Sequence, residues 1–556
     1  MSLMNGRHDT LEDGRDVTTV CFGPSADRRS LLDRAHRGDI VGALGRVPAA
    51  DTGPRPSRRR RIAALLAIMG PGVIVLVADN DAGGISTYAQ VGQDYGLRFL
   101  WLLVVMAGVL LVNQEMVGRL GAVTGAGHAR LIYERFGRRW GAFALGDLLI
   151  VNFLVIVTEF IGIALALGYF GVSRYISVPL AALVLIALPV AGRFRRWERA
   201  MYLLVAVSFA AVPLLVLAHH AAPLTPAASG PRHLAPESTV FMVIALVGTT
   251  VAPWQLFFQQ SNVVDKRITA RWLRYELADT VVGTLLFVLG AVAILVACAL
   301  AFAAAPLHGA FVDASTVADQ LRNQAGQWAG ALFAVALLNG SILGAGAVTL
   351  SASYAIGDVS GTKHSLHRTW RDAPKFHGSY AALVVMAAAI VLIPKAPLGI
   401  VTTGVQALAG VLLPSALVFL LLLCNDRAVL GPWVNARWLN VIAATVVAVL
   451  LVLSGLLTIS TLFPHAENNW HITAALVISA GVLGVLFGMR LSSQDAPSPP
   501  GSDSPDKPVW TMPPIETLPP PARSATRTIA LVILRAYLLL AVLAVVIKVA
   551  GLIAAS

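Results

Sequence analysis

Charged residues are scarce in this chain of 556 residues: Asp, Glu, Lys and Arg together make up 13%, whereas 56% of the residues are hydrophobic. The mean hydropathy is +0.72. A soluble protein of this length needs more charged surface than that to stay in solution. The composition therefore excludes a large soluble protein and indicates an integral membrane protein.

Cysteine is rare too. The three cysteines, Cys21, Cys298 and Cys424, lie far apart and show no spacing typical of a metal site, so we expect neither a cysteine-bound metal nor disulfides. A cleavable secretory signal is also missing, because residues 1–60 are polar and rich in arginine. This segment is predicted to remain in the cytoplasm.

The sequence signatures of enzymes are absent as well. The chain has no Ser/His/Asp order typical of hydrolases, no His-Glu-x-x-His and no phosphate-binding loop. Five histidines fall in segments expected to be polar loops, where we expect them to be solvated: His219, His220, His364, His367 and His377. We therefore predict no enzymatic activity and no cofactor.

Hydrophobic runs are what the sequence has in abundance. Apolar windows predict twelve membrane spans, near residues 62–95 (interrupted), 100–118, 143–170, 174–192, 199–218, 239–261, 280–304, 328–356, 379–395, 399–424, 438–462 and 471–489. A further candidate span at 528–554 contains Arg535 and Lys548, and these charges weaken the prediction that it crosses the membrane.

The basic residues of the loops predict the orientation. Arg58-Arg59-Arg60-Arg61 directly precede the first span, and loops with two to five Lys or Arg then alternate with loops that carry one or none. Since positively charged loops stay inside, we predict a multi-pass protein of the inner (plasma) membrane with a cytoplasmic N-terminus. The net charge of +12 then reflects contact with the anionic inner leaflet rather than with nucleic acid.

The first span contains two carboxylates and a carboxamide at membrane depth, Asp79, Asn80 and Asp81. An ionisable residue there costs several kcal/mol unless it has a partner, so it is a candidate functional residue. Gly83 and Gly84 follow and permit an unwound backbone, which is tolerated at that depth only where it lines a cavity. A broken helix with an acid at the break is typical of a cation-binding transporter.

The sixth span is predicted to be broken too, at Ala252-Pro253. Proline in mid-helix frees a carbonyl from its partner, here that of Thr249. A proline kink without any binding role is the alternative. However, spans one and six are corresponding helices of a five-plus-five inverted repeat, and paired interruptions at those positions favour a midplane binding site.

Several motifs in order resemble the natural resistance-associated macrophage protein (NRAMP) family of divalent-metal transporters over about residues 62–460. They are Asp81-Ala82-Gly83-Gly84-Ile85-Ser86-Thr87 with Gln90-Val91-Gly92 and Tyr95-Gly96, Arg119 to Gly125, Glu159-Phe160-Ile161-Gly162, Gln406 with Leu413-Pro414, and Asn425-Asp426-Arg427. The resemblance implies an all-α, LeuT-type fold with a ten-helix core and additional C-terminal helices.

These inferences divide the chain into five parts. They are a basic, disordered N-terminus (1–61), the ten-helix transporter core (62–424), two additional transmembrane helices (425–490), a disordered Pro/Ser-rich linker (491–525) and a C-terminal hydrophobic helix (526–556).

The departures from the family pattern bear on the substrate. The family's metal ligands are an Asp and an Asn of the first helix, a Met of the sixth helix and a backbone carbonyl. Here Asp81 stays, but Gly84 replaces the Asn and Ala252 replaces the Met. Trp254 and Gln259 stand where the family usually has histidines. The acid-rich break is similar to that of a divergent branch, the NRAMP-related magnesium transporters.

Without a thioether, the predicted ligands are all oxygens: Asp81, the Thr249 carbonyl and Gln406, with Asp79 and Asn80 as further candidates. Such a site suits a hard cation, Mn²⁺ or Mg²⁺. Two alternatives remain open: Asp81 is bound to unwound amides with no ion, and Asp79 only caps the break.

Glu159 is predicted to be a gate or proton group, as the family implies, or else to form a structural hydrogen bond. The family's proton-linked acid three residues earlier is Ile156 here, so we favour uniport. Two charges moving across 100 mV gain roughly 4.6 kcal/mol.

An amino-acid or other organic-solute transporter of the same fold is the alternative function, with half-helix N-termini facing a substrate carboxylate. Asp81 discriminates between the two, because a carboxylate at the break repels an anion. The expected partners are the metal ion and the lipid bilayer, with no nucleic acid and no obligate protein partner evident.

Overall fold

The computed structural model describes residues 34–221, 236–303, 311–394, 398–462, 470–492 and 510–539, apart from residues 52, 54, 56, 191, 522, 523 and 526. In these ranges, nine helices are long and apolar enough to cross a membrane, or ten if one bent pair is counted as a span. The prediction of an all-α integral membrane protein is confirmed.

A short N-terminal part precedes the bundle: a 3-10 turn (Arg34–His36), the antiparallel strands β1 (Ile40–Gly42) and β2 (Gly45–Val47), and the helix α1 (Arg58–Ile68). The interrupted spans are α2 (Pro71–Ala78) with α3 (Ala82–Tyr95), and α10 (Pro236–Thr250) with α11 (Pro253–Asp265). The other helices are α4 (Leu100–Thr124), α5 (His128–Phe136), α6 (Arg138–Tyr169), α7 (Arg174–Val190), α8 (Phe194–Val207), α9 (Ala211–Ala221), α12 (Leu273–Ala301), α13 (Ala314–Ala325), α14 (Gln327–Ser360), α15 (Pro374–Val391), α16 (Leu398–Cys424), α17 (Arg427–Leu430), α18 (Arg437–Leu462) and α19 (Trp470–Ser492).

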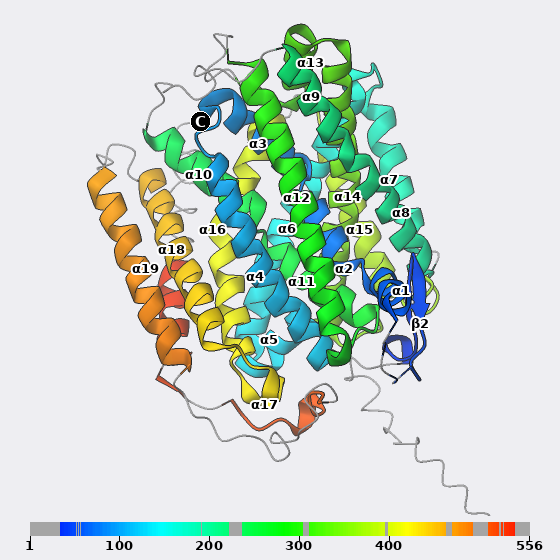
Figure 1. Ribbon diagram of the computed structural model, residues 1–556, viewed down its shortest axis with the longest axis vertical. Coiled ribbons are helices and arrows are strands. Elements are labelled where there is room, and N and C mark those ends of the chain that lie inside the picture. The colour runs from blue at the N-terminus through cyan, green and yellow to red at the C-terminus, as the bar shows by residue number, and fades with distance from the viewer. Residues whose placement is uncertain are drawn as a thin grey trace, which may run out of the picture.

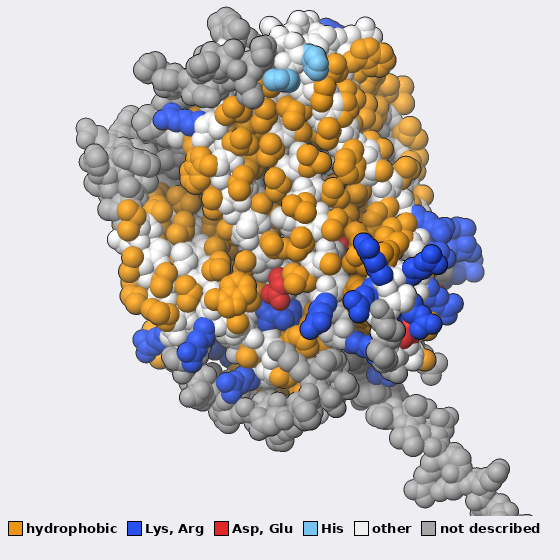
Figure 2. All heavy atoms as spheres, viewed as in Figure 1, with side chains coloured by type: hydrophobic (Ala, Val, Ile, Leu, Met, Phe, Trp, Pro, Cys, Tyr) orange, Lys and Arg blue, Asp and Glu red, His pale blue; other side chains and the backbone are white. Residues whose placement is uncertain are grey.

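Figure 1 shows the long helices running side by side along the long axis of the molecule, with α18 and α19 on one flank and α7 and α8 on the other. The two interrupted spans lie between these flanks. Hydrophobic side chains cover the middle of the face seen in Figure 2, as expected for a surface in contact with lipid, and Lys and Arg gather at the end that carries α1. We call this the basic end.

The first span begins later than predicted. Instead of one apolar helix from residue 62 to the break, α1 and α2 are separated by a bend of 50°. Gly70 at this bend has φ of +150°, a conformation that residues with a side chain rarely adopt, and Pro71 then starts α2. Only the eight residues of α2 therefore precede the break.

Two segments predicted to be disordered are ordered where the structure describes them. Residues 34–51 of the N-terminus fold into the turn and hairpin. In the predicted linker, residues 510–521 lie against the bundle, since Met512 N–H donates to the Val123 carbonyl (3.2 Å) and Arg135 donates to the Pro519 carbonyl (2.7 Å). Residues 1–33 and 493–509 lie outside the described part. So does most of the predicted C-terminal helix, which is described only to residue 539.

Candidate ion-binding site

The first break consists of three polar residues between α2 and α3. Asp81 is the N-cap of α3: its backbone is extended, and its side chain accepts a hydrogen bond from Gly84 N–H (2.7 Å). The first turn of a helix leaves N–H groups without partners, and a carboxylate there satisfies one of them. Asp81 is only 3% exposed, so this carboxylate is buried in the middle of the bundle.

The other two residues of the break reach different neighbours. The Asp79 carboxylate accepts a hydrogen bond from the Gln255 amide of α11, while its second oxygen is buried with no hydrogen-bond partner. The Asn80 amide donates to the Phe287 carbonyl of α12 (3.1 Å), and its own oxygen also has no partner. The break thus leaves polar oxygens buried and without hydrogen-bond partners, which costs free energy.

The prediction that Gly83 and Gly84 form the unwound part is wrong. Both lie in the first turn of α3, and the unwound residues are 79–81. The glycines serve close packing instead. A Cβ on Gly83 would come within 1.6 Å of Gln406 Nε2, and one on Gly84 would lie 3.2 Å from Thr249 Oγ1. Glycine here lets α16 and α10 approach the break.

The second break faces the first. Ala252 is extended (φ −98°, ψ 145°) and Pro253 begins α11, as predicted. In a continuous helix, the N–H of residue 253 would bind the Thr249 carbonyl, and proline has none to donate. The Thr249 carbonyl therefore lacks its helical donor, and the Thr249 hydroxyl is buried with no hydrogen-bond partner.

Glu159 of α6 stands beside the first break. One of its carboxylate oxygens accepts a hydrogen bond from Ala82 N–H (3.1 Å), and the other has no partner. A Cβ on Gly344 of α14 would lie 2.8 Å from Asp81 Cβ and 3.0 Å from Glu159 Cδ, so both acids flank one glycine. The structural hydrogen bond weighed above is present, and it holds Glu159 next to Asp81.

The structure therefore brings four of the predicted ligand residues to the breaks, Asp81, Asp79, Thr249 and Gln406, while the amide nitrogen of Asn80 turns to α12. In the described part of the chain, no three His, Cys, Asp or Glu side chains form a preassembled metal cage. An oxygen site of two carboxylates and neutral donors does not require one.

Sequence reasoning missed two residues that position the breaks. Gln255 joins Asp79 to α4 by accepting a hydrogen bond from Gln114 (3.2 Å). Asp279 of α12 accepts from the N–H groups of Gly70 (3.0 Å) and Gly72 (2.6 Å) and so caps the start of α2. An acid directly before the predicted span 280–304 was the available signal for Asp279, because such a residue needs a partner once the helix extends over it.

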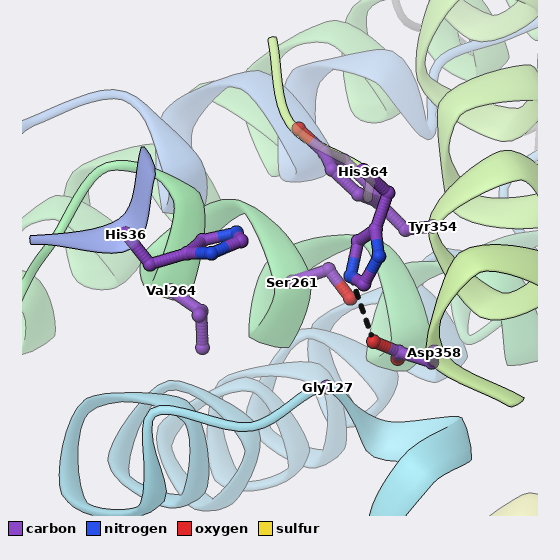
Figure 3. A pocket seen from close by; sticks show the side chains of 7 residues that line it. All are labelled: His36, Gly127, Ser261, Val264, Tyr354, Asp358 and His364. Atoms are coloured by element: carbon purple, nitrogen blue, oxygen red, sulfur yellow. Dashed lines mark ion pairs between the residues drawn. The ribbon is translucent and has the colours of Figure 1, made fainter. Parts of the chain in front are cut away.

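The prediction of solvated loop histidines is wrong for three of the five. His364 is 6% exposed, His377 is fully buried, and His367 stacks on Phe194. Figure 3 shows His364 from the loop after α14 facing Asp358, 3.1 Å away, in a small pocket at the basic end that His36 also lines. Burial opposes a charged imidazole, but the hydrogen bond and charge of Asp358 outweigh it and raise the pKa of His364.

A family model described as "Natural resistance-associated macrophage protein-like" (Nramp) matches residues 72–460. The chain belongs to this family. Among Nramp proteins, the "Divalent metal cation transporter MntH" of Burkholderia ambifaria is 28% identical over 449 residues, which cover 76% of this chain and 94% of the relative. "Divalent metal cation transporter MntH 1" of Pseudomonas aeruginosa is 28% identical over 415 residues, or 70% and 90% of the two chains.

Among Nramp structures, that of the Eremococcus coleocola manganese transporter matches with a TM-score of 0.59 at 20% identity, covering 80% of this chain and 97% of the other. This likeness shows the fold, and it confirms the LeuT-type architecture. The Nramp match begins at residue 72, so the N-terminal hairpin and α1 precede it.

Proposed function

We propose that this protein transports divalent metal cations, with Mn²⁺ or Mg²⁺ as substrate, by alternating access around the two broken helices. The observation that carries this proposal is the buried Asp81 carboxylate at the first break, close to Thr249 at the second: Asp81 Oδ1 and Thr249 Oγ1 lie 3.3 and 3.2 Å from the same Cβ position of Gly84. The relatives named as divalent metal cation transporters and the manganese transporter structure support it.

The donor set favours a hard cation. Asp81 and Asp79 supply carboxylates, and Thr249 supplies a neutral oxygen close to the break. The side-chain amide of Gln406 lies beside Gly83, with its nitrogen nearest. Ala252 has no donor atom in its side chain, so no soft ligand competes at the place of the family's methionine. The manganese transporter among the matching structures supports Mn²⁺. Mg²⁺ rests on this donor set alone, since partly hydrated Mg²⁺ needs few protein ligands.

The start of α3 is already occupied by acids, which argues against an amino-acid substrate. A substrate carboxylate would need free N–H groups at a half-helix N-terminus. In this chain Glu159 binds Ala82 N–H and Asp81 binds Gly84 N–H. Both acids would also repel the substrate's negative charge.

The basic end is the cytoplasmic end in this proposal, since Lys and Arg concentrate there and MntH relatives are bacterial proteins. An inward-negative membrane potential then drives cation entry. Ile156 is fully buried and offers no proton-binding group at the place of the family's acid, which supports uniport.

Uptake of Mn²⁺ and Mg²⁺ into proteoliposomes, run as a competition panel at two pH values, tests the function. Asp81→Asn keeps the size of the side chain and removes its charge, and we expect it to abolish uptake. Asp319→Asn on α13 is the matched control, because Asp319 is half exposed and forms an ion pair with Arg322 of the same helix. Uptake retained in Asp81→Asn, or amino-acid uptake by the unmodified protein, contradicts the proposal.

A further inference from the structure

The hinge between α1 and α2 carries a buried ion pair from two other helices. Lys266, just after α11, lies 2.5 Å from Glu198 of α8, and both side chains are fully buried. Lys266 also donates a hydrogen bond to the carbonyl of Met69, which is the last residue before Gly70. A Cβ on Gly70 would lie 2.1 Å from Glu198 Oε1, so the pair rests directly on the hinge.

The N-terminal hairpin covers this ion pair. Ala43 N–H, in the tight turn between β1 and β2, donates to the second oxygen of Glu198. A Cβ on Gly42 would lie 2.2 Å from the Ala67 carbonyl and 3.2 Å from Lys266 Nζ. Ile40 and Val47 pack in one apolar cluster with residues of α1, α4 and α11. The hairpin therefore contacts α1, on one side of the hinge, and the Glu198–Lys266 pair that rests on the hinge; Figure 1 shows it beside α1.

A second tie joins the segment before the hairpin to the end of α11. Arg267 donates to the carbonyls of Ala35 (2.9 Å) and Asp39 (3.1 Å). Arg267 has φ of +67°, the one positive value of a non-glycine residue in the described part. A bulky residue in that conformation is strained, and the contacts with the N-terminal segment offset the strain.

We propose that the hairpin (residues 40–47) and the Glu198–Lys266 pair form a lock that holds α2 closed at the basic end, and that the lock must open before an ion can leave toward the cytoplasm. The geometry supports this because α2 is the only helical segment between the hinge and Asp79. A swing of α2 that moves the hinge therefore breaks the contact of Lys266 with the Met69 carbonyl and separates Gly70 from the Glu198–Lys266 pair that packs against it. The hairpin precedes the Nramp match, whereas Glu198 and Lys266 lie within it. Its role in transport rests on the proposed function, but its opening can be measured without any metal.

Thiol labelling from the basic end tests the lock. Ala78→Cys places a reporter at the end of α2, where the side chain is fully buried, in full-length protein that retains Cys298 and carries serine at positions 21 and 424. Gly42→Leu wedges the hairpin away from Ala67, and Gly53→Leu is the matched control, because nothing lies within 4 Å of its Cβ position. A membrane-impermeant thiol reagent is added to metal-free inside-out vesicles, and labelled peptides are quantified by mass spectrometry.

We expect Gly42→Leu to label at position 78 at least ten-fold faster than Gly53→Leu, with Cys298 of α12 unlabelled in both. Gly45→Ala, whose Cβ would lie 3.0 Å from Ala67 Cβ, is a milder wedge with an expected two- to three-fold increase. If Gly42→Leu does not fold, the labelling rate of Gly45→Ala relative to Gly53→Leu tests the lock instead. Equal rates in the folded variants and the control overturn the proposal, as does labelling of position 78 and Cys298 together, which reports unfolding. Because the labelling is done without metal, neither result bears on the proposed transport of divalent cations, which the uptake assay in proteoliposomes tests separately.

Discussion

The variant Gly83→Ala can distinguish the contribution of close packing at the first break to stability from the contribution of Gln406 to ion binding. The new methyl group would overlap Gln406, with 1.6 Å to Nε2 and 2.5 Å to Cδ, so the whole end of that side chain must move. Overpacking of this kind costs about 1–3 kcal/mol, whereas replacing a helical glycine with alanine recovers about 0.5–1 kcal/mol. We expect a net loss of roughly 1–2 kcal/mol in unfolding free energy, seen as a lower melting temperature in detergent.

The transport consequence follows from the displaced amide. If Gln406 is a ligand, its removal from the break raises the KM for Mn²⁺ about ten-fold, close to the ~1.4 kcal/mol that one polar contact can supply. Gly83→Ala combined with Gln406→Ala should restore the melting temperature, because it makes room for the methyl group, but it should keep the high KM. Gly108→Ala on α4 has open space around it and serves as the control, with unchanged KM.

An unchanged KM in Gly83→Ala with a lowered melting temperature would refute the assignment of Gln406 as a ligand. Recovery of both properties in the double variant would refute it too, since packing alone would then explain the effect. An unchanged melting temperature in Gly83→Ala would contradict the close contact itself.

Three further predictions follow from the site and its surroundings. Ala252→Met adds a thioether at the second break, so the competition panel should shift toward Cd²⁺ or Fe²⁺, and an unchanged order would count against the soft-ligand argument. Mn²⁺ uptake should carry no proton flux in a pH-jump assay, because Ile156 lacks an ionisable group, and a flux proportional to uptake would disprove uniport. The pKa of His364 is raised above 6.5 in the folded state, so its stabilising pair with Asp358 is fully present below that pH and is lost as the pH rises through the raised pKa. The melting-temperature deficit of Asp358→Asn should therefore be largest near about pH 6 and shrink at higher pH, whereas a deficit that grows with pH would contradict the charged pair.

Local sequence patterns were enough to predict a helical membrane protein and the approximate places of both interruptions. A run of apolar residues has to lie in lipid, and an acid or a proline inside such a run disturbs the helix at that position whatever surrounds it. For the same reason, Asp81, Ala252 and Pro253 were predicted at the breaks where the structure has them.

Partners from distant segments could not be predicted in this way. Gly83 and Gly84 were expected to unwind, but their role follows from the approach of Gln406 and Thr249, which no local pattern encodes. His364 was expected in water because its neighbours in the sequence are polar, yet the fold buries it against Asp358.

By itself, the sequence determined the class of protein, its helical spans and the place of its acids, because hydropathy and backbone chemistry act over a few neighbouring residues. Only the tertiary structure decided which oxygens meet at the break, where the first span bends, and that the polar N-terminus folds over the hinge. These contacts join segments far apart in the chain, and close packing selects them only once all the helices are in place.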